Sequence, residues 1–110
     1  MSETPYTIAL RHVVERDPHL GADLLVAWQE RRTFFLACEL ARARQDERVW
    51  TAPTSAPVSE AFELAWLLDE RMVTAVCTYA ADPTQRELVE DVVRACRKHY
   101  ARGIASGQGA

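Results

Sequence analysis

The sequence predicts an all-α protein folded as a compact bundle of four helices. Four segments repeat apolar residues at helical spacing, and capping residues or Asp-Pro pairs stand between them. The chain has 110 residues, of which 48% are apolar and 26% charged, so it can bury a core of ordinary globular size. We expect one helical domain over residues 1–105, followed by a frayed C-terminal tail at residues 106–110.

The first predicted helix begins with Thr4 as its N-cap and Pro5 at its first helical position, where a missing N–H costs nothing. Its apolar stripe is Tyr6, Ala9, Leu10, Val13 and Val14. Asp17-Pro18 ends this helix, because the residue before a proline avoids the α region. The same pair starts the next helix, which can restart after Gly21.

The second helix carries one apolar face through residues 20–38, and its polar tail continues to Arg48. A polar interruption at residues 29–32 places Arg31 on the apolar face. Either the helix bends there, which gives a bundle of five helices, or Arg31 pairs with a carboxylate. Residues 33–38 and 72–79 have the composition of strands, which leaves an α+β fold as an alternative. Residues 49–58 contain two prolines and are expected to form an extended connection.

The third helix begins near Ser59 and is apolar on nearly all sides, which is typical of a central or interface helix. We assign Phe62, Ala65, Trp66, Met72, Val73, Val76 and Tyr79 to a core face. Leu64, Leu67, Leu68 and Ala75 form a second face. Asp82-Pro83 starts the last helix, whose stripe is Leu88, Val89, Val92, Val93, Cys96 and Tyr100. Gly103 is expected to stop that helix.

Composition also bounds the class of protein. The formal net charge is −3, which disfavours a nucleic-acid partner. The sequence has neither a secretory signal pattern nor an apolar run long enough to cross a membrane, so we expect a cytoplasmic protein. Its content of Ala, Arg, Val and Leu suggests a bacterial or phage origin. The widely spaced Cys38, Cys77 and Cys96 favour buried thiols over disulfides or a zinc site.

No cofactor or metal site is predicted. His12, Glu15 and His19 have the spacing of ligands on one helix face, but Pro18 interrupts that helix before His19. The sequence contains no Glu-x-x-His pair of the kind that di-iron bundles need, and no glycine-rich phosphate loop.

The string RACRKH places Arg94 five residues before His99 on the last predicted helix. It resembles the active-site motif of the HEPN ribonuclease family. The resemblance implies RNA cleavage without metal, by Arg94 and His99 side chains that face each other across a dimer. The alternative interpretation is that these residues belong to a group of cations near a helix C-terminus, where the helix dipole favours positive charge.

The surplus of large apolar side chains favours another function. We expect a small, non-enzymatic, intracellular protein-interaction module, such as an adaptor, an inhibitor or the small subunit of a complex. Its predicted partner-binding residues are Trp50, Leu64, Leu67 and Leu68, and its partner is a protein, with a homodimer as one form. The HEPN-like ribonuclease is the first alternative, and a bundle that binds an apolar ligand is the second.

Overall fold

The computed structural model describes residues 3–43 and 58–108. Within these residues the chain forms four α-helices: α1 (Pro5–Arg16), α2 (Pro18–Ala43), α3 (Val58–Ala81) and α4 (Arg86–Gln108). A short 3-10 helix, η2 (Pro83–Gln85), precedes α4. The prediction of an all-α bundle of four helices is confirmed. The α+β alternative is wrong, because both segments of strand-like composition lie inside helices.

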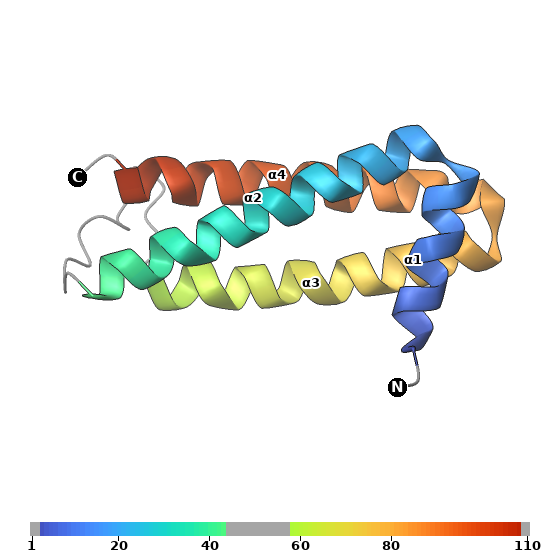
Figure 1. Ribbon diagram of the computed structural model, residues 1–110. Helices are drawn as coiled ribbons and strands as arrows, with labels where there is room; N and C mark the ends of the chain where they lie inside the picture. Colours follow the sequence, from blue (N-terminus) through green and yellow to red (C-terminus); the bar gives the residue numbers. More distant parts are fainter. Residues whose placement is uncertain (1–2, 44–57, 109–110) are drawn as a thin grey trace.

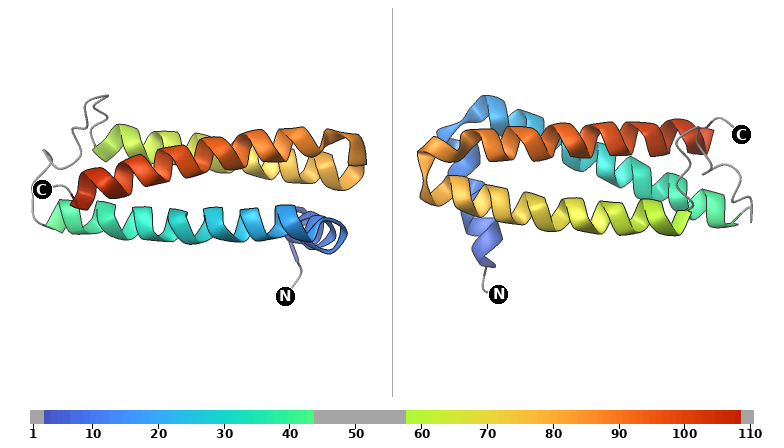
Figure 2. Two further views of the ribbon diagram at one scale, coloured as in Figure 1. Left: turned by 90° about the horizontal axis from the view of Figure 1, so that it is seen from above. Right: turned by 180° about the vertical axis from the view of Figure 1, so that it is seen from behind.

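The helices form two layers. Helices α3 and α4 run antiparallel to each other as a long hairpin, and α2 crosses one face of that hairpin in the same direction as α4 (Figure 1). The short α1 crosses α3 on the same side as α2, near the end where both interhelical turns lie (Figure 2). Within the described residues, the opposite face of the α3–α4 hairpin is covered by no other helix.

Local signals set the boundary between α1 and α2. The Thr4 side chain accepts a hydrogen bond from the Thr7 amide at 3.2 Å, and Asp17 accepts one from the Leu20 amide at 3.2 Å. The expected restart after Gly21 is wrong, because α2 begins at Pro18. A Cβ atom at Gly21 would lie 3.3 Å from Cα of Val14, so the glycine lets α1 approach α2 closely.

Helix α2 runs unbroken through residues 29–32, so the bend that would have given a fifth helix does not occur. The other expectation is confirmed, because Arg31 meets a carboxylate on α3. Its Nε lies 2.9 Å from Oδ1 of Asp69 and its Nη2 lies 2.7 Å from Oδ2. The Arg31 guanidinium also lies 4.5 Å from the centre of the Phe35 ring. A bidentate, partly shielded ion pair therefore joins α2 to α3.

The core lies between the two layers. Its largest fully buried side chains are Tyr100, Phe34, Leu20, Leu24, Val13, Val76, Val89 and Val92. Phe34 stands at the centre of an aromatic cluster, with its ring centroid 5.3 Å from that of Tyr100 and 6.5 Å from that of Phe62. Every helix contributes to this core, because Ala9 and Val13 add the buried face of α1.

The predicted division of α3 into two faces is wrong in part. Trp66 is 63% exposed and Val73 is also exposed, whereas Leu68 and Ala75 belong to the core. The buried residues of α3 are Ala61, Ala65, Leu68, Met72, Ala75, Val76 and Tyr79. They form one arc, because α4 packs on one side of α3 and α1 crosses the other. Helix α2 contacts α3 through the Arg31–Asp69 pair and the stacked Phe35 and Phe62 rings. Apolar residues on both edges of that arc are left at the surface.

The stripe predicted for α4 is buried from Val89 to Tyr100, but Leu88 is exposed. Gly103 does not stop the helix. It is buried inside α4, which continues to Gln108. A glycine ends a helix only when the chain turns at that point, and here the chain continues as a helix.

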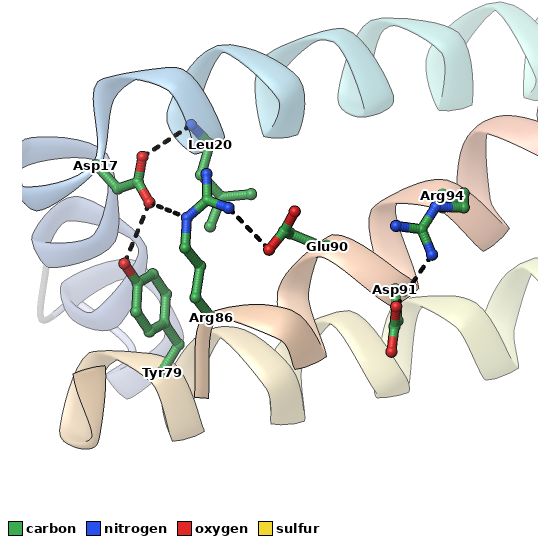
Figure 3. A network of polar contacts seen from close by, with 7 residues as sticks. All are labelled: Asp17, Leu20, Tyr79, Arg86, Glu90, Asp91 and Arg94. Carbon is green, nitrogen blue, oxygen red and sulfur yellow. Dashed lines mark hydrogen bonds and ion pairs between the residues drawn. The ribbon is translucent and has the colours of Figure 1, made fainter. Parts of the chain in front are cut away.

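A polar network joins the two interhelical turns (Figure 3). Oδ2 of Asp17 accepts hydrogen bonds from Nε of Arg86 at 2.6 Å and from the Tyr79 hydroxyl at 3.2 Å. Arg86 also pairs with Glu90 at 2.7 Å. The hydrogen bond from Arg86 is the main cause that holds the pKa of Asp17 below its ordinary value. The network fixes the end of the bundle where α1 crosses α3.

Candidate functional site

The uncovered face of the α3–α4 hairpin contains an apolar groove of about 590 Å³. Leu64, Leu67 and Leu88 form its walls and are 43%, 57% and 43% exposed. Leu68 and Val92 are buried and lie at its floor. The remaining lining residues are Glu70, Arg71, Thr74, Ala75 and Asp91. Three large apolar side chains therefore stand partly in water along one groove, although the chain has a core that could bury them.

Charges of both signs flank this groove. Glu70 and Asp91 are acidic, and Arg71 is basic. Asp91 forms an exposed ion pair with Arg94 at 3.1 Å. Among the ion pairs of the described residues, none involves Glu70 or Arg71. The rim thus offers an unsatisfied cation and an unsatisfied anion beside exposed leucines.

A second groove, of about 460 Å³, lies between α2 and α4 and has a different character. Its lining is mostly charged: Asp23, Glu30, Glu90, Arg94, Arg97 and Lys98, with Leu20, Val93 and Ala101. Several of these charges are already paired within the chain, as in the contact of Arg97 Nε with Glu30 at 3.1 Å. This groove therefore resembles a solvated charged surface more than a docking site.

The structure brings together part of the predicted partner-binding set. Leu64 and Leu67 lie side by side along the α3–α4 groove, and Leu68 lies beneath them, 3% exposed. Trp50 lies outside the described residues. Sequence reasoning missed Leu88, because its spacing fits the core stripe of α4 as well as it fits a groove wall.

The structure separates the two residues of the HEPN-like motif. Five residues correspond to about 140° of rotation around an α-helix, so the Arg94 and His99 side chains leave α4 in different directions. Arg94 is exposed and lines the α2–α4 groove. The His99 ring packs against Phe34, with 5.0 Å between ring centroids, and its Nε2 lies 3.1 Å from the carbonyl oxygen of Ala61. Within one copy of the chain, the two side chains therefore do not meet.

The surroundings of His99 fit a structural role. Burial lowers the pKa of its imidazole below the ordinary value, and the nearby Arg102 acts in the same direction. The neutral ring can donate its Nε2 hydrogen to the Ala61 carbonyl and thereby join α4 to the start of α3.

The cysteines and the candidate metal ligands form no chemical centre in the part of the chain that the structure describes. Cys38 and Cys96 are buried and Cys77 is half-buried, and burial raises the pKa of the Cys96 thiol. No three His, Cys, Asp or Glu side chains in residues 3–43 and 58–108 lie close enough together to hold a metal ion.

Comparison with known protein families, curated proteins and solved structures found no match for this chain. None of the described helices combines the length and the apolar character that a membrane crossing requires. The fold and the two grooves therefore define the structural class of this protein as a four-helix bundle with one uncovered apolar face. That face is the basis for a functional proposal.

Proposed function

We propose that this chain is a small, non-enzymatic protein-interaction module that binds through the groove between α3 and α4. The observation that carries this proposal is the row of exposed leucines on the uncovered hairpin face, with Leu64 and Leu67 on α3 and Leu88 on α4. Apolar side chains gathered along a groove are typical of surfaces that another protein covers. Full burial of a leucine side chain contributes about 1.5–3 kcal/mol, and these three, about half exposed, can each contribute part of that on association.

The occupant that we propose is a second copy of the chain. The rim of the groove carries the acidic Glu70 and Asp91 and the basic Arg71, which forms no ion pair within the described residues, so one surface holds both members of an ion pair. Two copies of such a surface can satisfy each other's charges across a two-fold axis. A partner of one charge sign would leave half of this rim unsatisfied.

Sedimentation velocity at micromolar concentrations tests the proposal. We expect the wild-type chain to sediment as a dimer and the variant Leu67→Lys to sediment as a monomer. The matched control is Leu25→Lys, because Leu25 on α2 is 59% exposed, close to the 57% of Leu67, and lies outside the groove. A wild-type monomer at high concentration, or equal loss of association in both variants, would contradict the proposal.

A further inference from the structure

Four of the exposed residues of α3 form a stripe whose charges are symmetric about its centre. Glu60, Leu64, Leu67 and Arg71 follow one another at spacings of four, three and four residues, so they form one stripe along the helix. All four are exposed, and the last three line the groove. The stripe has an acid at one end, a base at the other and two leucines between, with its midpoint between Ala65 and Trp66.

Such a stripe complements itself only when the second copy runs in the opposite direction. In the antiparallel arrangement Glu60 faces the second copy's Arg71, and Leu64 faces the second copy's Leu67. In a parallel arrangement Glu60 would face Glu60 and Arg71 would face Arg71, and juxtaposed like charges oppose association. No ion pair within the described residues involves Glu60 or Arg71, so both are available for this contact.

Helix α4 repeats the pattern. Its exposed residues Glu87 and Asp91 precede its exposed Lys98 and Arg102, and the two pairs are symmetric about the midpoint between Arg94 and Ala95. Asp91 lines the α3–α4 groove, whereas Lys98 lies at the border with the α2–α4 groove. Antiparallel pairing would place Glu87 opposite the second copy's Arg102. Asp91 also contacts Arg94 within the chain, but that pair is exposed and therefore weak.

The two midpoints lie at the same level of the hairpin. The contact between His99 Nε2 and the Ala61 carbonyl, 3.1 Å long, places Ala61 level with His99. The midpoint of the α3 stripe lies between four and five residues after Ala61, and the midpoint of the α4 pattern lies between four and five residues before His99. Because α3 and α4 run in opposite directions, both midpoints are displaced from this contact toward the same end of the hairpin (Figure 1). A single two-fold axis that crosses the hairpin at this level would therefore satisfy both helices at once.

We infer that two copies pack the uncovered faces of their α3–α4 hairpins together, with the two α3 helices antiparallel. Glu60 of each copy then pairs with Arg71 of the other, and these two ion pairs determine the orientation. This inference rests on the proposed self-association through the α3–α4 groove and adds the register to it. The leucines supply most of the buried apolar area, whereas the charges select one arrangement among those that the groove allows.

Charge reversal tests the register. We expect Glu60→Arg and Arg71→Glu each to weaken dimerisation at least about tenfold, since each places two like-charged pairs across the axis. The double variant Glu60→Arg/Arg71→Glu restores both pairs and should associate as the wild-type chain does. A 1:1 mixture of the two single variants should form a heterodimer, because one variant carries two cations and the other two anions at these positions. Far-UV circular dichroism verifies that every variant is folded.

The outcomes separate this inference from the proposed function. If the wild-type chain dimerises and Leu67→Lys abolishes dimerisation, but the double variant and the mixture do not recover, the register is wrong while the groove remains the interface. Packing of α3 on the second copy's α4 would give that result, because the charges of α4 would then face the altered residues. If the wild-type chain is a monomer, the proposed function and this inference both fail.

Discussion

Helix α4 forms one groove with α2 and another with α3, and the two grooves differ in how their side chains are satisfied. Four of the six charged residues that line the α2–α4 groove form ion pairs within the chain, as in the Glu30–Arg97 contact. The α3–α4 groove has exposed leucines and an Arg71 that forms no ion pair within the described residues. A surface that is satisfied internally gains little from a partner, whereas the second surface can gain both apolar burial and ion pairing. We therefore place the interaction on one flank of α4 and not on the other.

The largest expected effect is a difference in folding stability between a substitution at the floor of the α3–α4 groove and one at its wall. Val92 is buried at the floor, so Val92→Asp should destabilise the fold by about 3–5 kcal/mol, because it buries an unpaired charge. Leu67→Lys at the wall should change the free energy of unfolding by less than about 0.5 kcal/mol under conditions where the chain is monomeric. Urea unfolding followed by circular dichroism measures both. Equal effects would show that the groove wall is part of the core.

The next effect compares two ion pairs that α2 makes. Arg31→Met should cost about 2 kcal/mol, because it removes a bidentate pair and leaves Asp69 partly shielded without its cation. Arg97→Met removes the more exposed pair with Glu30 and should cost less than about 1 kcal/mol. Thermal unfolding of both variants against the wild-type chain gives the difference. A reversed order would mean that the α2–α4 contact depends on its charges more than the α2–α3 contact does.

A pair of tyrosines tests the same contrast between satisfied and unsatisfied polar groups. The Tyr79 hydroxyl donates to Asp17 at 3.2 Å, so Tyr79→Phe should destabilise the fold by about 1 kcal/mol. The Tyr6 hydroxyl is buried and has no partner among the described residues, and burial raises the pKa of Tyr6 to about 12. Tyr6→Phe should therefore stabilise the fold by about 1 kcal/mol, because no hydrogen bond is lost and a desolvation cost is removed. Destabilisation by Tyr6→Phe would indicate that its hydroxyl has a partner after all.

The smallest effect is a pH dependence at His99. Its pKa in the folded chain lies below the unfolded value of 6.5, so the unfolded chain binds more protons as the pH falls. The stabilisation from the neutral ring is present above pH 6.5 and is lost as the pH falls through 6.5 toward the lower folded pKa. The difference in Tm between pH 7.5 and pH 5.5 should be smaller in His99→Gln than in the wild-type chain. An identical difference would show that the His99 imidazole titrates normally.

Features that depend on a few neighbouring residues were predictable from the sequence. The Thr4 cap and the two Asp-Pro boundaries act within one helical turn, and all of them form. The buried part of α4 was also predictable, since one narrow apolar stripe between charged residues leaves a single way to orient the helix. Gln85 lies three residues after Asp82, which is the spacing of a capping box, but the Asp82 amide donates to the Thr78 carbonyl instead.

What the sequence by itself determined was the helical class and the local start signals at Thr4, Asp17-Pro18 and Asp82-Pro83. It left bending and pairing at Arg31 as alternatives, and the contact with Asp69 on α3 decided between them. The tertiary structure alone decided which side of α3 is buried, because α3 is apolar nearly all around and its periodicity allows more than one orientation. The positions of α2 and α4 place Leu68 inside and leave Trp66, Leu64 and Leu67 outside. The tertiary structure also decided that His99 packs against Phe34 and that Glu60 and Arg71 form no ion pair within the described residues. Whether a side chain is buried or paired depends on residues that are distant in the sequence and close in space, so the pattern along one helix cannot predict it.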